Sequence, residues 1–296
     1  MIFAYRDTSK WGERLVQAGK KLGVDVCLFN ESNEVPSKGD HAVFVHMNHR
    51  PEFRENNKRM MHELSEKEVT LIPTLLEAQL YDDKIAQYKL LYEHMPKSYI
   101  IQSVKEAEDA LNELNFPFIS KASTGAGSSN VRLIHNKLAA REEIKLAFGE
   151  GIPLHFGQKQ VDYLFWQHFY EGNDCTWRVT IIANKYVCIS RRNNRDDLPF
   201  PTGDVEAINT LNSFTKKLMD KAYSITKNHN FILCAMDFIK DKNEPILLEI
   251  SVGWPMKKYT NSVFFQPKGK GWEPSIYTNG DFFDLVIKAI TNKEFH

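Results

Sequence analysis

Short β-rich runs alternate with helical patterns over the first 73 residues, and this alternation constrains the fold more than any other feature of the chain. Such alternation is typical of βαβ units, whose strands form a parallel sheet. The sequence therefore predicts a small open α/β domain over residues 1–73. The expected strands are Ile2–Tyr5, Val24–Phe29, Ala42–Val45 and Val69–Pro73, and the expected helices are Trp11–Leu22 and Pro51–Leu64.

From residue 74 onward the pattern changes to longer β-rich runs joined by tight turns, which predict antiparallel hairpins. The chain is thus expected to be α/β, with a parallel sheet first and antiparallel sheets after it. The expected strands are Phe116–Ala122, Val131–Ile134, Tyr163–Tyr170, Thr176–Ile182, Tyr186–Arg191, Phe231–Ile239 and Ile246–Ile250. The expected helices are Asp82–His94, Val104–Leu114, Asn136–Phe148, Val205–Lys227 and Phe282–Ile290.

Charge and cysteine usage narrow the function classes. Lys and Arg number 38 and so do Asp and Glu, so we expect no general field for binding nucleic acid. No apolar run approaches the ~20 residues that span a bilayer, and the first residues lack the regions of a secretory signal. The four cysteines form no CxxC pair, which favours free thiols in a reducing compartment. We therefore expect a cytoplasmic protein without a membrane or nucleic-acid partner.

Two carboxylates stand inside apolar β-rich runs and form the first candidate site. A hairpin centred on Asn243 would place Asp237 directly opposite Glu249, and Ser251 would share the face of Glu249. Paired carboxylates in an apolar wall repel each other unless a cation neutralises them, and oxygen ligands of this kind select Mg²⁺ or Mn²⁺. The alternative is a register shifted by one residue, with one carboxylate facing solvent.

A lysine and a loop of small residues form the second motif. Lys121 ends a predicted strand, and Ser123–Asn130 is rich in Gly, Ser and Thr. Small residues let backbone N–H groups approach phosphate oxygens, and the lysine supplies charge. The loop matches neither the P-loop nor a full GxGxxG, so an ordinary flexible turn explains it as well.

Arginines in apolar strands form the third motif. Arg178 and Arg191 lie in two successive β-rich runs, and Arg192 follows directly. An arginine in such a run needs an anionic partner, either a bound carboxylate or phosphate or a structural ion pair.

Together and in this order, the three motifs resemble the ATP-grasp superfamily, most closely its RimK-like and glutathione-synthetase-like ligases. The resemblance covers roughly Asp82 to Pro255. It implies a two-lobed ATP-grasp domain over residues 74–296, with a small lobe at about 96–165, behind a small α/β domain that shares the substrate site.

The resemblance also implies roles for individual residues, with Asp83-Lys84 matching the Asp-Lys of the family. The implied ligands of Mg²⁺ or Mn²⁺ are Asp237, Glu249 and Ser251. The implied arginines near the γ-phosphate and the acyl intermediate are Arg178 and Arg191. For ATP the implied residues are Lys84, Lys121, Thr124, Gly125, Ser128, Gln167, His168, Phe169 and Asp174.

Three positions depart from the family pattern. Ser251 stands where Asn is usual, and His168 stands where the hinge usually carries an acid. Asp174 lies four residues before Arg178, whereas RimK-like members place an acid two residues before.

The activity implied by the resemblance is that of an ATP-dependent ligase, which joins a small-molecule or peptide carboxylate to an amine through an acyl phosphate. A phosphotransferase of the same fold and a non-catalytic nucleotide-binding protein are the alternatives. A homodimer is compatible with the resemblance. His46, His49 and Arg50 follow the third predicted strand and could contact a substrate, as could Lys257 and Lys258, although a polar or basic turn explains either segment equally well.

Overall fold

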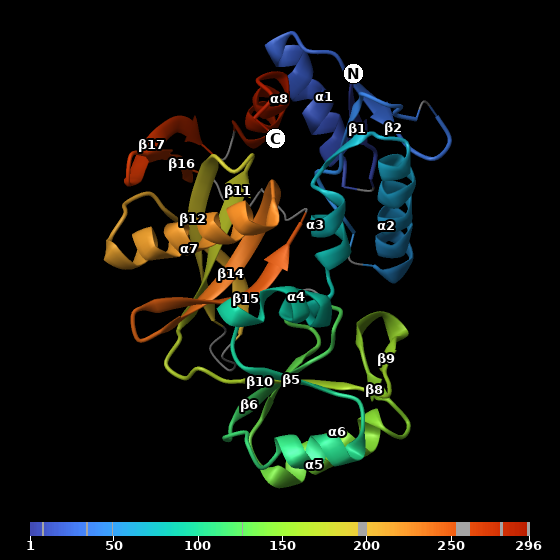
Figure 1. Cartoon of the computed structure of the whole chain (residues 1–296), viewed down its shortest axis with the longest axis vertical. Coiled ribbons are helices and arrows are strands. Elements are labelled where there is room, and N and C mark those ends of the chain that lie inside the picture. The colour runs from blue at the N-terminus through green and yellow to red at the C-terminus, as the bar shows by residue number, and fades with distance from the viewer. Residues whose placement is uncertain are drawn as a thin grey trace.

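The structure is a computed structural model that describes residues 1–294 except 8, 34, 49, 126, 195–199, 253–260 and 279–280, and it describes the backbone alone for 201–204. The molecule contains three main sheets (Figure 1). One parallel sheet is followed along the chain by two antiparallel sheets, which confirms the predicted order of parallel before antiparallel. In the described part of the chain, no helix has both the length and the apolar character needed to cross a bilayer.

The parallel sheet has the strand order β2-β1-β3-β4 and is built entirely from the first 72 residues. Its strands are β1 (Ile2–Tyr5), β2 (Val26–Phe29), β3 (His41–Val43) and β4 (Thr70–Ile72). The helices between them are α1 (Trp11–Leu22) and α2 (Pro51–Glu66). α1 buries Trp11, Leu15 and Ala18 at helical spacing and ends at Gly23, whose φ of 69° suits glycine.

The second sheet is antiparallel and has the order β5-β10-β6-β7. Together with α5 and α6 it forms what we call the small lobe. Its strands are β5 (Ser98–Ile101), β6 (Phe118–Lys121), β7 (Val131–Ile134) and β10 (Leu164–His168), and its helices are α5 (Val104–Ala110) and α6 (Lys137–Ala147). The short strands β8 (Ile152–Pro153) and β9 (Lys159–Gln160) pair beside it. This lobe has a core of its own, whose buried apolar residues all lie between Ile101 and Trp166.

The large sheet has the order β15-β14-β11-β12-β16-β17, with β13 also paired to β12. Its strands are β11 (Cys175–Ile182), β12 (Tyr186–Asn194), β13 (Pro201–Ile208), β14 (Leu233–Asp241), β15 (Glu244–Ser251), β16 (Val263–Lys268) and β17 (Gly271–Thr278). Helix α7 (Ser213–His229) packs against one face, where its Leu218 and Ile225 join the core with Val179 and Met236.

The predicted helix Val205–Lys227 was wrong in its first part. Residues 205–208 belong to β13, which pairs with an edge of β12 through Ile189 and Ile208. The helix starts only after Asn212, whose side chain accepts from the Thr215 amide. Strand pairing across the sheet thus outweighs a local helical pattern. Strands β16 and β17 had no counterpart in the sequence-based prediction.

Helices α3 (Leu75–Leu80) and α4 (Lys84–Leu91), followed by the 3₁₀ turn Tyr92–His94, connect the parallel sheet to the small lobe. The buried Glu77 of α3 accepts hydrogen bonds from the backbone amides of Ile232 and Leu233, each at 2.8 Å. Because these amides lie at the start of β14, the connection is fixed to the large sheet.

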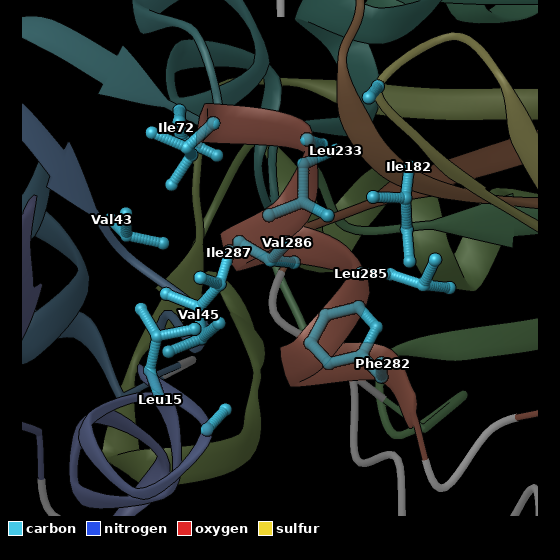
Figure 2. Close-up of a cluster of buried hydrophobic side chains, with 14 of the residues drawn as sticks. Leu15, Val43, Val45, Ile72, Ile182, Leu233, Phe282, Leu285, Val286 and Ile287 are labelled. Atoms are coloured by element: carbon cyan, nitrogen blue, oxygen red, sulfur yellow. The ribbon is translucent and has the colours of Figure 1, made fainter. Parts of the chain in front are cut away.

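One apolar core joins the two ends of the chain, as Figure 2 shows. Helix α8 (Phe282–Thr291) contributes Leu285 and Ile287 to it, while the parallel sheet contributes Val43 and Ile72. Leu233 of the large sheet belongs to the same cluster. The parallel sheet and the large sheet therefore share a continuous interior.

Candidate active site

A pocket of ≈ 420 Å³ is lined by residues from both antiparallel sheets, and by His46, which follows β3 of the parallel sheet. Its lining contains most of the residues that the sequence singled out. They are Lys84, Lys121, Gly125, Ser128, Gln167, His168, Phe169, Arg178, Asp237, Glu249 and Ser251.

The two carboxylates on the floor of this pocket pair across strands β14 and β15. Asp237 lies opposite Glu249, as predicted, and Ser251 lies opposite Ala235. The turn is not centred as expected: Phe238 pairs with Leu247, and a bulge then restores the pairing of Asp237 with Glu249. An extra residue in one strand shifts the register by one, which explains how the predicted pair forms from a different turn.

Asp237 is held by two arginines. Arg178 lies opposite it on β11, and its Nε and Nη2 donate to Oδ1 and Oδ2, both at 2.6 Å. Arg192 Nη1 lies 3.3 Å from Oδ2. Burial alone would raise the pKa of Asp237, but the charge and hydrogen bonds of Arg178, helped by Arg192, lower it below its usual value. Asp237 is therefore a carboxylate at neutral pH.

The oxygen atoms of the pocket suit a magnesium ion that also binds a phosphate ligand. Asp237, Glu249 and Ser251 offer oxygen only, and Mg²⁺ is commonly held by one or two carboxylates together with substrate phosphates. Among the described residues, no cluster of three His, Cys, Asp or Glu side chains forms a metal site by itself. The residues thus fit a metal that arrives with a phosphate ligand.

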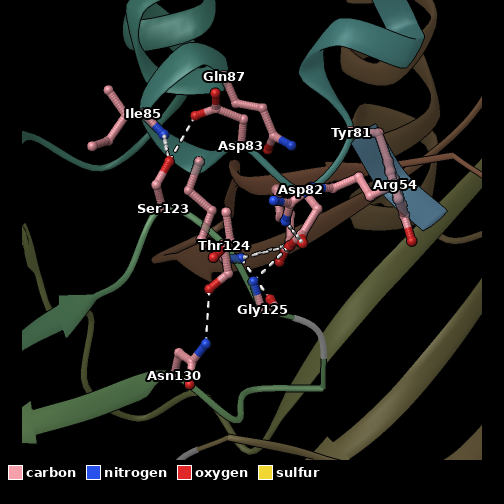
Figure 3. Close-up of polar contacts among 12 residues, drawn as sticks. Arg54, Tyr81, Asp82, Asp83, Ile85, Gln87, Ser123, Thr124, Gly125 and Asn130 are labelled. Carbon is pink, nitrogen blue, oxygen red and sulfur yellow. Dashed lines mark hydrogen bonds and ion pairs between the residues drawn. The ribbon is translucent and has the colours of Figure 1, made fainter. Parts of the chain in front are cut away.

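The glycine-rich loop meets the start of α4 at the pocket wall, as Figure 3 shows. Lys84 Nζ donates to the Gly125 carbonyl at 2.7 Å, and the Gly125 amide donates to Asp82 Oδ1 at 2.7 Å. Ser123 Oγ donates to Asp83 Oδ1 at 2.7 Å. A Cβ at Gly125 would lie 2.4 Å from the Asn130 side chain, so this position requires glycine.

The carboxylate of Asp82 also reaches the N-terminal part of the chain. Arg54 of α2 donates from Nη1 to Asp82 Oδ2 at 2.7 Å, and both side chains are buried. Lys84 Nζ lies 3.8 Å from Asp82 and 3.7 Å from Glu249. A network of charges thus runs from α2, through the loop, to the floor of the pocket.

Lys121 sits at the end of β6 with its ammonium in the pocket wall. Nζ donates to Gln167 Oε1 at 2.7 Å, and Gln167 Nε2 donates to Ser98 Oγ at 2.9 Å. Burial lowers the pKa of Lys121 to about 8, a shift that Glu249 opposes and Lys84 increases. An anionic ligand would hold the protonated form of Lys121.

Gln167 and His168 end β10, Phe169 follows directly, and all three line the pocket. His168 lies against Tyr99, with ring centroids 6.3 Å apart. Burial lowers the pKa of His168, and the charge of Lys97 lowers it further, so this ring is neutral at pH 7.

The structure does not bring Arg191 or Asp174 into this group. Alternation along β12 places Arg192 on the face of Arg178 and Arg191 on the opposite face, where its guanidinium lies 5.9 Å from the Trp177 ring. Arg191 pairs with Asp174, which is largely exposed. Neither residue lines the pocket among those described, nor does Thr124.

Sequence reasoning missed Arg192, although a signal was present. The tight turn at Asn184 centres the hairpin so that Arg178 faces Ser190, and Arg192 then shares that face. Asp82 and Arg54 were also missed, because only the packing of distant segments brings them to the loop. Arg50 is exposed, with its guanidinium 5.8 Å from the Phe156 ring, while His46 lines the pocket. His49, Lys257 and Lys258 lie outside the described residues.

The comparisons with known proteins agree with this geometry. Residues 81–263 match the family model of the RimK-like ATP-grasp domain. The chain therefore belongs to the RimK-like ATP-grasp family. A search of curated proteins gave no match.

Solved structures with the same fold are distant in sequence. A RimK domain ATP-grasp protein from Sphaerobacter thermophilus is 15% identical, with a TM-score of 0.62 over 87% of this chain and 93% of that one. D-alanine–D-alanine ligase from Bacillus anthracis is 12% identical, with a TM-score of 0.65 over 99% and 97%. N5-carboxyaminoimidazole synthetase from Staphylococcus aureus, complexed with ADP, is 14% identical, with a TM-score of 0.66 over 98% and 77%.

Proposed function

We propose that this protein is an ATP-dependent ligase that joins a carboxylate to an amine through an acyl phosphate and releases ADP and phosphate. The observation that carries the proposal is the meeting, in one pocket, of two buried lysines, a glycine-rich loop, a pair of carboxylates and a pair of arginines. Phosphate binding alone would need the lysines and the loop. The arginines beside Asp237 suit charge that develops on a transferring group.

Different residues of the chain would bind the nucleotide and the metal. Lys84 and Lys121 hold the phosphates of ATP, while Gln167 to Phe169 border the adenine at the end of β10. Asp237 and Glu249, with help from Ser251, would hold magnesium, which would supply positive charge against the phosphate oxygens.

Activation of the carboxylate makes it electrophilic. A carboxylate oxygen attacks the γ-phosphorus, ADP departs, and the acyl phosphate that results carries a good leaving group. We assign to Arg178 and Arg192, which both contact Asp237 in the pocket, the stabilisation of negative charge on the phosphoryl group and on the tetrahedral oxyanion. This assigns to Arg192 the role that the family resemblance gave to Arg191. The loop around Gly125 excludes water, because acyl phosphates hydrolyse.

We also place the protein in the cytoplasm, because its four cysteines are free thiols and three of them are buried.

The test is a screen of ADP and phosphate release with panels of small acids, amino acids and short peptides, each with and without added amines, and with products weighed by mass spectrometry. A ligase releases ADP and phosphate in equal amounts only when acid and amine are both present. ADP without free phosphate, together with a phosphorylated product, would replace the ligase with a phosphotransferase. ATP binding without turnover of any pair would leave a nucleotide-binding protein.

A further inference from the structure

A buried carboxylate and a histidine form a pair at the edge of the parallel sheet. Asp7 follows β1 and His46 follows β3, and these two strands are neighbours. His46 Nδ1 lies 2.7 Å from Asp7 Oδ2. The other oxygen of Asp7 accepts from the amide and the hydroxyl of Ser9, at 2.9 and 2.6 Å. The carboxyl ends of parallel strands are where ligands bind in open α/β sheets.

Exposure differs sharply within the pair. The side chain of Asp7 is 6% exposed, whereas that of His46 is 21% exposed. His46 lines the same pocket as Lys84, Arg178 and Glu249. The ring of Trp11 lies nearly parallel to the imidazole, at 13°, with centroids 6.4 Å apart. The histidine is therefore anchored on one side and open to the pocket on the other.

The hydrogen bond that Asp7 accepts from Nδ1 fixes the tautomer of His46. Burial would raise the pKa of Asp7, but the hydrogen bonds from His46 and Ser9 lower it below its usual value, so Asp7 is ionised at neutral pH. An ionised Asp7 accepts a hydrogen bond from Nδ1–H, and in the neutral ring with its proton on Nδ1 the lone pair is on Nε2. This is the form of imidazole that can take up a proton.

Amide formation needs such a group, because an amine is mostly protonated at neutral pH and a protonated amine cannot attack. Two other ionisable groups of the pocket already have close partners: Lys121 donates to Gln167, and Asp237 is bound by Arg178. His168, the second histidine among the described lining residues, lies at the end of β10 beside Tyr99.

We propose that His46 is the general base that deprotonates the acceptor amine, and that Asp7 is the positioning residue that holds its ring. This inference rests on the proposed ligase function. One proton of the ammonium group moves to His46 Nε2, and the nitrogen lone pair attacks the acyl carbon. The bond between that carbon and the phosphate oxygen then breaks, phosphate leaves with the electron pair and the amine's second proton, and His46 returns its proton to solvent.

Hydroxylamine separates this role from activation of the acid, because it is largely unprotonated at neutral pH and attacks acyl phosphates without a base. The wild-type protein is compared with His46→Asn, Asp7→Asn and the control His62→Asn. His62 lies on the exposed side of α2, 3.7 Å from Glu66, and so has a carboxylate neighbour away from the pocket. Each variant is assayed with the acid and amine that stimulate the wild type most, and with hydroxylamine in place of the amine.

We expect His46→Asn to lower amide formation by about 10²–10⁴-fold, the contribution typical of a general base, and to keep hydroxamate formation within a few-fold. Asp7→Asn should lower amide formation less and also spare the hydroxamate. In Asp7→Asn the nitrogen NMR shifts of His46 should show the proton moving between Nδ1 and Nε2, which a purely structural role for Asp7 would not produce. His62→Asn should match the wild type in both assays.

Two results overturn the assignment while the ligase function stands. One is an equal loss of amide and hydroxamate in a His46→Asn protein that melts like the wild type, and the other is no loss of either. If no acid in the panel yields hydroxamate even with the wild type, the proposed ligase function fails, and the base assignment fails with it.

Discussion

Arg54 and Asp82 form a buried ion pair 2.7 Å long, although 27 residues lie between them in the chain. The second oxygen of Asp82 accepts from the amide of Gly125 at 2.7 Å. One carboxylate thus connects a helix of the N-terminal sheet with the loop that we propose holds phosphate. The position of this loop therefore depends on the packing between the two parts of the chain.

Substitution of Arg54 by methionine removes the guanidinium, and the buried Asp82 keeps the hydrogen bond from the Gly125 amide and, as a neighbouring cation, Lys84 at 3.8 Å. Breaking a buried pair in this way costs about 3 kcal/mol of the free energy of unfolding, the lower end of the usual range because Lys84 remains. Denaturant unfolding measures this loss, and ATP affinity should fall in the same variant. Arg59→Met, on the exposed side of the same helix, is the control. Unchanged stability in Arg54→Met would contradict the structural role of the pair.

The lowered pKa of Lys121 determines the direction in which ATP affinity should change with pH. Above its pKa of about 8 the ammonium of the free protein loses its proton, so ATP affinity should weaken as the pH rises from 7 to 9. Lys121→Met should bind ATP more weakly at pH 7, by about 1.5–3 kcal/mol for one charge-assisted contact. The variant should also lose most of the pH dependence. Calorimetry of both proteins at the two pH values tests this, with the exposed Lys159→Met as the control. Equal pH dependence in wild type and Lys121→Met would remove Lys121 from the phosphate site.

The same pKa predicts how stability changes in the absence of ligand. The unfolded chain keeps the Lys121 proton up to about pH 10.5, and the folded protein releases it at about 8. Between these values the unfolded state binds more protons, so Lys121 makes the free energy of unfolding rise with pH. The difference in stability between wild type and Lys121→Met, measured from pH 7 to 10, should follow this sign.

Glu249→Gln keeps the shape of the side chain and removes its charge. We expect folding to survive, since Glu249 is partly exposed and its nearest cation, Lys84, lies 3.7 Å away. Turnover should collapse, and Mg²⁺ should no longer strengthen ATP binding, because a carboxylate ligand is lost. Glu244→Gln, at the far end of β15 where Glu244 pairs with Lys217, is the matched control. Wild-type activity of Glu249→Gln at saturating Mg²⁺ would rule out the proposed metal ligand.

The adjacent Arg191 and Arg192 of β12 provide the sharpest test of which arginine stabilises the phosphoryl group during its transfer. Arg192→Lys should lower turnover by about 10²–10³-fold with ATP affinity within a few-fold, the loss typical of one oxyanion donor. Arg191→Lys should have little effect, because its side chain lies on the opposite face beside Trp177. The reverse order of the two effects would return the role to Arg191.

The sequence predicted the parts of the site that depend on local pairing. Asp237 and Glu249 could be placed opposite each other because a short turn limits the register of a hairpin, although the predicted centre of the turn was wrong by a half-residue and a bulge restores the pair. The same reasoning extends to Arg192, which shares the face of Arg178. The order of the strands in the large sheet does not follow from local patterns. Residues 205–208 of β13 were mistaken for the start of a helix, because no local signal shows that they pair with β12.

Contacts between distant segments were beyond sequence reasoning. In the sequence, the pattern around Arg54 indicates only a charged residue on an amphipathic helix. The pattern around Asp7 indicates only a loop residue after a strand. Arg54 gains its partner Asp82 only when α2 packs against the segment before α4. Asp7 gains its partner His46 only when β1 and β3 pair within the parallel sheet.

The shared core around α8 determines which part of this molecule can move. Val43 of the parallel sheet and Leu233 of the large sheet belong to one apolar cluster with Leu285, so a rotation between these two sheets would expose apolar surface to water. The small lobe has a separate core. Opening and closing of the pocket is therefore expected as a swing of the small lobe alone, carrying Lys121 and the Gly125 loop, against a rigid body that holds His46, Arg178 and Asp237. The hydrogen bond from the Gly125 amide to Asp82 joins the loop of the small lobe to that body, so a swing of the lobe would have to break it on opening and form it again on closure.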